Sequence, residues 1–157
     1  MSVVQLHLML NHVPLIGMAF ALLLLGAAAW RRNDGMARLG LGVMVGLAVV
    51  TAVVFLTGEP AEEALESVVA VSESVIHPHE EAAEASLIAT GLAGVLALVA
   101  LLATWRRALP RWVTGTAFAA ALVSSSMLGW TANLGGKIRH TEIGTAALSD
   151  EGEDRRR

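Results

Sequence analysis

Four apolar stretches of nearly equal length constrain this chain more than any other feature. They cover residues 13–30, 39–57, 87–105 and 112–131. Each approaches the roughly 20 residues that a helix needs to cross about 30 Å of hydrocarbon. The chain is 55% hydrophobic and only 16% charged, which is too apolar for a soluble domain of 157 residues. The sequence therefore predicts one all-α integral membrane domain, 1–157.

The polar joints between the stretches predict how the helices are arranged. "RRNDGMAR" separates the first two stretches and "RRALPR" the last two. Joints this short make neighbouring helices antiparallel, so we expect an antiparallel four-helix bundle. The longer segment in the middle holds residues 61–76, where apolar residues recur at helical spacing with glutamates opposite. This pattern predicts an extra amphipathic helix on the outer face. A polar tail, 141–157, follows the last apolar stretch.

The distribution of charge predicts the orientation in the membrane. Six of the eleven basic residues lie in the two short joints, namely Arg31, Arg32, Arg38, Arg106, Arg107 and Arg111. The segment 58–86 has eight glutamates and no lysine or arginine. Because short basic loops stay in the cytoplasm, we expect the joints inside and both termini outside.

All five histidines then lie on the outer side: His7, His12, His77, His79 and His140. This grouping favours a ligand-binding role, although histidines are also common at membrane interfaces. Positions five apart on a straight helix point about 140° apart, so His7 and His12 either serve different partners or are separated by a break near Pro14. In the second case residues 2–12 form a short helix of their own. His12, at the boundary, is the leading candidate ligand.

Carboxylates gather on the same side as the histidines. The sequence Thr-Gly-Glu-Pro, 57–60, predicts a turn at the membrane surface that aims the Glu59 carboxylate, with Glu62 close behind. Pro78 and the glutamates after it, including Glu80, are typical of the first turn of a helix, where they complement the helix dipole. These glutamates are candidate metal ligands or ordinary helix-start residues.

The segment "TANLGGKIRHTEIG" predicts the end of the last helix at Asn133 and the Gly135–Gly136 pair. Lys137, Arg139 and His140 follow, and glycines also allow a backbone to approach a ligand closely. The basic residues are equally typical of an anchor at lipid headgroups.

Several functions are excluded or disfavoured. The chain has no cysteine, which rules out disulfides, iron–sulfur clusters and covalently attached c-type haem. No ionisable residue lies in the middle of a stretch, so an ion conduit or transporter is disfavoured. Close helix packing and a possible oligomer are favoured by small residues on three of the apolar stretches. These are Gly42 and Gly46, Gly91 and Gly94, and the serines 124–126.

"HLMLNHVPLIG" and "TANLGGKIRHTEIG" resemble the opening and closing signatures of a widespread bacterial family of small four-helix membrane domains of unassigned function. Members occur beside Rieske and c-type cytochrome modules. The resemblance implies membrane electron transfer, with redox subunits or a c-type cytochrome as partners. Together with the charge distribution, it predicts a place in the bacterial inner membrane with both termini periplasmic. His7, His12 and His140 match the family by position, and His79 matches more loosely. The acidic segments depart from the family pattern.

Two chemical hypotheses and a structural one follow. In the first, b-type haem is bound by residues among His7, His12, His79 and His140, with Lys137 and Arg139 near the propionates. In the second, an iron, zinc, manganese or copper ion is bound by His12, His79, His140, Glu59, Glu62 and Glu80. In the third, the chain is an accessory subunit whose histidines only contact other subunits. Its surroundings are the lipid bilayer, and no nucleic-acid partner is expected.

Overall fold

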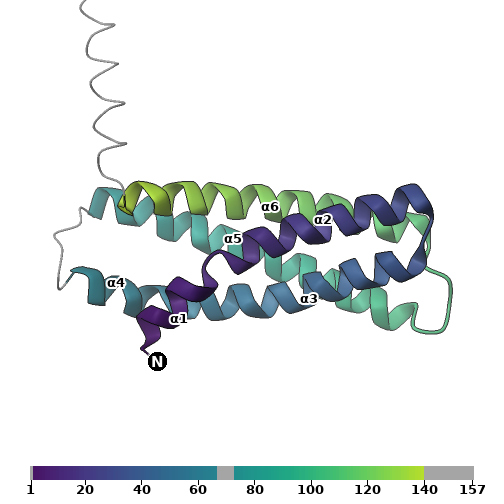
Figure 1. Cartoon of the computed structure of the whole chain (residues 1–157), viewed down its shortest axis with the longest axis horizontal. Helices are drawn as coiled ribbons and strands as arrows, with labels where there is room; N and C mark the ends of the chain where they lie inside the picture. Colours follow the sequence, from purple (N-terminus) through teal and green to yellow (C-terminus); the bar gives the residue numbers. More distant parts are fainter. Residues whose placement is uncertain (1, 67–72, 140–157) are drawn as a thin grey trace, which may run out of the picture.

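The computed structural model describes residues 2–66 and 73–139. Within these ranges the chain is helical and has no strand (Figure 1). The helices are α1 (Val3–Leu10), α2 (Val13–Arg31), α3 (Asp34–Leu56), α4 (Gly58–Glu66), α5 (Glu73–Ala103) and α6 (Arg111–Arg139). The short first helix is therefore present, and the chain turns at Asn11 and His12 before α2 begins with Pro14 in its first turn.

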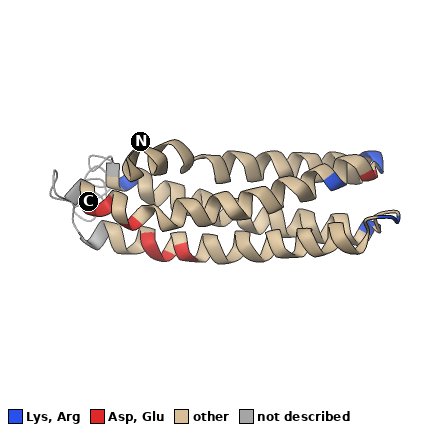
Figure 2. Cartoon of the chain, turned by 90° about the horizontal axis from the view of Figure 1, so that it is seen from below, with Lys and Arg blue, Asp and Glu red and all other residues tan. Residues whose placement is uncertain are grey.

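The four long helices form a ring in which every neighbour is antiparallel. Helix α2 packs against α3 and α6, and α5 packs against the same two helices, so that α2 and α5 are diagonally opposite (Figure 1). The predicted all-α antiparallel four-helix bundle is confirmed. We name its two ends by their residues: the arginine end holds the α2–α3 and α5–α6 joints, and the histidine end holds α1, α4 and the start of α5 (Figure 2).

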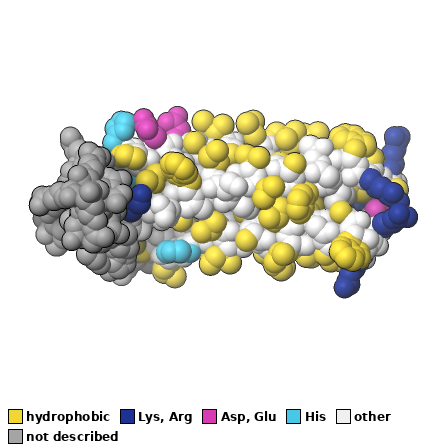
Figure 3. Space-filling view, turned by 90° about the horizontal axis from the view of Figure 1, so that it is seen from above, with side chains coloured by type: hydrophobic (Ala, Val, Ile, Leu, Met, Phe, Trp, Pro, Cys, Tyr) yellow, Lys and Arg dark blue, Asp and Glu magenta, His cyan; other side chains and the backbone are white. Residues whose placement is uncertain are grey.

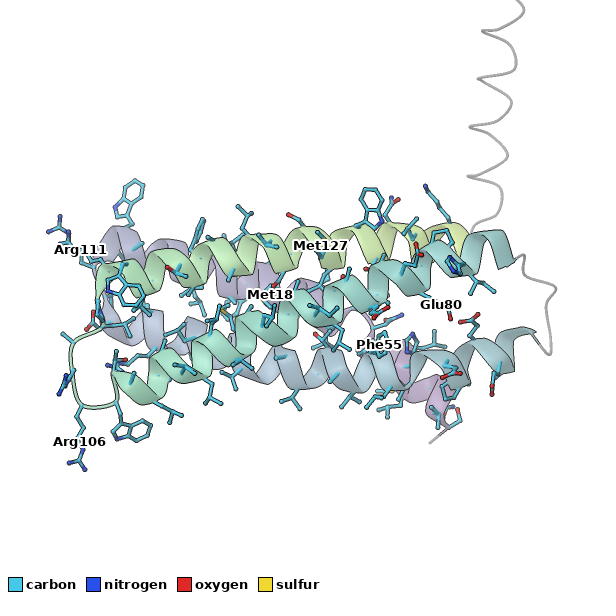
Figure 4. The ribbon with its side chains drawn as sticks, turned by 180° about the vertical axis from the view of Figure 1, so that it is seen from behind. Met18, Phe55, Glu80, Arg106, Arg111 and Met127 are labelled. Atoms are coloured by element: carbon cyan, nitrogen blue, oxygen red, sulfur yellow. The ribbon has the colours of Figure 1, made fainter. Side chains whose placement is uncertain are left out.

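Close approach of the helices depends on glycine at a few positions. A Cβ added to Gly94 in α5 would lie 2.4 Å from the Ala48 Cβ in α3, and one added to Gly40 would lie 2.9 Å from Cγ of Leu25. Large side chains of α2 and α3, such as Met18 and Met44, fill the remaining interior and are fully buried (Figure 4). Apolar helices that pack closely through small residues are typical of membrane bundles.

The outside of the bundle is apolar over most of its length (Figure 3). All four long helices are long and apolar enough to cross a membrane. Exposed tryptophans mark both ends of this surface: Trp30, Trp105 and Trp112 lie at the arginine end, and Trp130 lies toward the histidine end. Trp112 and Trp130 are about 27 Å apart along α6 at 1.5 Å per residue, close to the thickness of the hydrocarbon layer. Tryptophan prefers both membrane interfaces, so the spacing fits a multi-pass membrane protein.

Polar contacts hold the two joints together at the arginine end. The Arg38 guanidinium donates from Nη2 to the carbonyl oxygens of Thr104 and Arg107, at 2.7 Å each. The Asp34 carboxylate accepts the Leu109 backbone N–H at 2.9 Å. Arg106 and Arg111 point away from the bundle here, and Glu80 lies at the opposite end (Figure 4).

Helices α5 and α6 both extend further than the sequence predicts. Helix α5 begins at Glu73, so Pro78 is inside it and does not start it. Helix α6 continues through Gly135 and Gly136 to Arg139. No described glycine has a positive φ, which is the conformation that a glycine helix end requires. The two extensions pack against each other, and this packing outweighs the local signals for helix ends.

In the Thr-Gly-Glu-Pro sequence the helix is interrupted only at Thr57, and Gly58, Glu59 and Pro60 are already helical. Thr57 has φ −96° and ψ −3°, and α4 begins at the next residue and includes Pro60. Figure 1 shows α4 running on from the end of α3. The predicted amphipathic helix, 61–76, is divided between the end of α4 and the start of α5, and 67–72 lie outside the described residues.

Candidate functional site

His7 joins α1 to the end of α3. Ser2 caps α1 in a reciprocal pair with Gln5, and the helix directs the half-buried His7 ring toward α3. Its Nδ1 lies 3.1 Å from the Val54 carbonyl oxygen and 3.3 Å from Oγ1 of Thr57. A carbonyl oxygen only accepts, so Nδ1 carries the hydrogen. In the neutral ring the lone pair is then on Nε2, which is a metal-binding nitrogen.

His79 makes the same contact between α5 and α6. Its Nδ1 donates to the Thr131 carbonyl oxygen at 3.1 Å, which again leaves the lone pair on Nε2. The Thr131 hydroxyl donates at 2.8 Å to the carbonyl oxygen of Ala82 on α5 and contacts Oγ of Ser86 at 2.8 Å. These bonds fix the acceptor helix beside His79, so that the ring has a defined orientation.

Each of the two rings also lies against a glycine four residues after its acceptor. A Cβ on Gly58 would lie 3.7 Å from Cε1 of His7, and a Cβ on Gly135 would lie 3.0 Å from Cε1 of His79. Each imidazole therefore has a similar pair of neighbours: a backbone carbonyl that accepts its hydrogen bond and a glycine four residues later. These are Val54 and Gly58 for His7, and Thr131 and Gly135 for His79. At Gly135 the missing side chain makes room for the His79 ring, whereas a Cβ on Gly58 would be in ordinary van der Waals contact with His7.

His7 and His79 lie at the same end of the bundle, His7 on α1 and His79 near the start of α5. Metal-bound histidines usually donate their other ring N–H to a carbonyl or carboxylate, which fixes the tautomer and strengthens the ligand. Both rings already have this arrangement. We call them the histidine pair.

The other two described histidines, His12 and His77, do not dock against a neighbouring helix in this way. His12 is exposed, and its Nδ1 contacts Oδ1 of its neighbour Asn11. His77 is exposed on α5, with its Nδ1 3.7 Å from Oε1 of Glu81. His140 lies outside the described residues.

The candidate carboxylates do not assemble into a metal site. Glu59 and Glu80 are exposed and Glu62 is half-buried. Within 2–66 and 73–139, no three histidine, aspartate or glutamate side chains come together in a way that could hold a metal ion. Lys137 is exposed near the end of α6, and the side chain of Arg139 is not among those described. Among the predicted site residues, His7 and His79 are the two whose rings the described structure holds against a neighbouring helix.

Sequence reasoning missed the two acceptors, the backbone carbonyls of Val54 and Thr131, and the contact of Gly58 with the His7 ring. The signal for them is weak: a small residue follows each acceptor by four positions near a helix end. Comparisons with models of protein families, with curated proteins and with solved structures found no match. The functional argument therefore depends on the geometry of this chain.

Replacing Gly135 with alanine is expected to displace the His79 ring and weaken its hydrogen bond to Thr131. The new Cβ would lie 3.0 Å from Cε1 and 3.4 Å from Nδ1 of the ring. NMR of ¹⁵N-labelled histidine should show the His79 Nδ1–H signal shifting or exchanging faster with water. Gly136→Ala is the control, because nothing lies within 4 Å of its added Cβ. An unchanged His79 signal in Gly135→Ala would contradict the docking role.

Proposed function

We propose that this protein binds a b-type haem at its histidine end, through His7 and His79, and transfers electrons in the membrane. The observation that carries the proposal is the matching pair of Nδ1–H···O=C bonds, which leaves a lone pair on Nε2 of each ring. Two neutral imidazoles from different helices are a common ligand set for haem iron in a helical bundle.

The number of assembled ligands favours haem over a bare metal ion. Haem iron needs only one or two protein ligands, because the macrocycle supplies four nitrogens. A zinc site needs three or four protein ligands, and no such group forms among the described residues. An ion at the histidine pair would depend on His140 or on carboxylates such as Glu59 and Glu80, which the described structure leaves exposed.

The packing of the bundle supports a site at the histidine end. Gly94 against Ala48 and Gly40 against Leu25 bring the helices too close for a macrocycle between them further inside. When bound, the haem would supply a one-electron redox centre. His7 and His79 would hold the haem through Nε2, with their orientation fixed by the Val54 and Thr131 carbonyls, and Lys137 would be a nearby cation for the propionates.

The charge distribution supports an orientation for this site. We propose that the arginine end faces the cytoplasm of a bacterium and that the histidine end and both termini face the periplasm. The redox centre would then lie near the outer surface of the inner membrane. Other redox subunits or a c-type cytochrome, the partners that the family resemblance implies, would reach it from that side.

The visible spectrum of the full chain, purified in detergent from cells that make haem, tests the proposal. We expect a Soret band and sharp α and β bands on reduction. Elemental analysis of the same sample separates the alternatives. A colourless protein with stoichiometric metal would contradict haem binding and favour a bound iron, zinc, manganese or copper ion. A colourless protein without metal would contradict both and favour the accessory-subunit hypothesis.

A further inference from the structure

Three hydroxyl groups inside the bundle have no hydrogen-bond partner in the described part of the chain. They belong to Thr90 on α5 and to Ser124 and Ser125 on α6. Thr90 and Ser124 are 0% exposed, and the Ser125 hydroxyl oxygen is also shielded. A buried hydroxyl without a partner costs about 1–3 kcal/mol, so such a group in a native protein needs an explanation.

These hydroxyls differ from others in the same bundle. A serine or threonine inside a helix usually donates to the carbonyl oxygen four residues earlier. Thr51, Thr104 and Ser126 do this, with O···O distances of 2.8, 2.7 and 2.9 Å. The three unpartnered hydroxyls are therefore oriented away from the bond that their own helix offers.

The register of α5 and α6 places the three hydroxyls at one level. The Thr131 hydroxyl lies between Ala82 and Ser86, so residue 131 of α6 is level with about residue 84 of α5. The helices are antiparallel with equal rise, which puts Thr90 level with Ser124 and Ser125, about 9 Å further from the histidine end. Thr90 is also one turn from Ser86 and on the same helix face.

The bonding of Thr131 sets the direction of the Ser86 hydroxyl. The single hydroxyl hydrogen of Thr131 points to the carbonyl oxygens of Ala82 and Met127, at 2.8 and 3.1 Å. Ser86 must therefore donate to Thr131, and its own oxygen keeps lone pairs for a donor that comes from deeper in the bundle. A polar line thus runs from the His79 acceptor residue, through Ser86, toward Thr90.

We infer that internal water binds in the seam between α5 and α6, held by Thr90 and Ser124. Ser125 is rotated by about 100° around α6 and lies on the side of Phe118, which faces Gly26 of α2. A buried water needs two to four polar partners, and the Thr90 and Ser124 hydroxyls at one level supply two of them. Ser86 is a further acceptor one turn away. The water would extend the polar contacts of Thr131 and Ser86 into the apolar part of the bundle. Polar groups there have no bulk water with which to form hydrogen bonds.

Replacing Thr90 with valine tests the inference by the sign of its effect on stability. Valine has the same shape without the hydroxyl, so a dry Thr90 would give a more stable variant. Bound water predicts the opposite, a thermal midpoint in detergent lower by about 2–4 °C, because the water and its other partners lose a bond. The double variant Thr90→Val/Ser124→Ala should fall by less than the sum of the single variants, because both remove the same water.

Water-edited solid-state NMR of the full chain in lipid bilayers provides the direct measurement. We expect faster transfer of water magnetisation to Thr90 than to Thr51, the matched control that is buried and bonded within its own helix. A higher midpoint for Thr90→Val, additive single variants, or equal transfer to Thr90 and Thr51 would each overturn the inference. None of these readouts depends on whether haem binds.

Discussion

Replacing His79 with alanine is expected to abolish stable haem binding, seen as loss of the Soret band from the purified protein. His79 is held by a 3.1 Å bond to the Thr131 carbonyl oxygen and lies against Gly135, so alanine removes a ligand that is already oriented. Loss of an outer partner of a ligand costs about 10–100-fold in affinity, and loss of the ligand itself should cost more. His7→Ala should have the same effect.

His77→Ala is the matched control for this prediction. His77 is two residues from His79 on the same helix, but it is exposed and its ring faces Glu81. Its replacement should leave the spectrum unchanged. His12→Ala should do the same, because the His12 ring is exposed beside Asn11. If both His7→Ala and His79→Ala kept full haem occupancy, the proposal that these two histidines bind the haem would be contradicted.

Replacing Gly94 with alanine is expected to give the largest loss of stability, about 1–3 kcal/mol, because it overpacks the contact between α3 and α5. The added Cβ would lie 2.4 Å from the Ala48 Cβ and 3.4 Å from the Met44 carbonyl oxygen. These neighbours are helix backbone and a Cβ, which cannot rotate away. Unfolding of the purified protein by heat or by SDS measures the loss.

Two further variants make the Gly94 prediction specific. Nothing lies within 4 Å of a Cβ added to Gly91, one turn earlier on α5. Gly91→Ala should therefore be neutral or stabilising by up to about 1 kcal/mol, since alanine favours a helix. The double variant Ala48→Gly/Gly94→Ala should recover much of the loss. Equal effects of the Gly91 and Gly94 changes would contradict the packing described for α3 and α5.

The sequence predicts the bundle well because its strongest signals are long. A run of about 20 apolar residues has few alternatives to a membrane-spanning helix, and the arginine joints leave little freedom in topology. Helix ends depend on one or two residues, and here tertiary packing overrides them. Gly135 and Gly136 stay helical beside α5, and Pro78 lies within α5.

The site is less predictable than the fold for a similar reason. The sequence groups the histidines at one end, but the acceptors that orient them are backbone carbonyls, which no residue type identifies. His12 stands out in the sequence because it lies at a helix boundary. The structure leaves His12 exposed and docks His7, five residues earlier and within α1, against Val54.

Helix α1 has no buried residue, so hydrophobic burial does little to keep it in place. The imidazole of His7 joins it to the first half of the bundle, and His79 belongs to the second half. A ligand shared by the two rings would act as a cross-link between segments 72 residues apart in the sequence. Loading of the cofactor and final closure of this end of the protein would then be one event, and the empty chain would have its N-terminus only loosely attached.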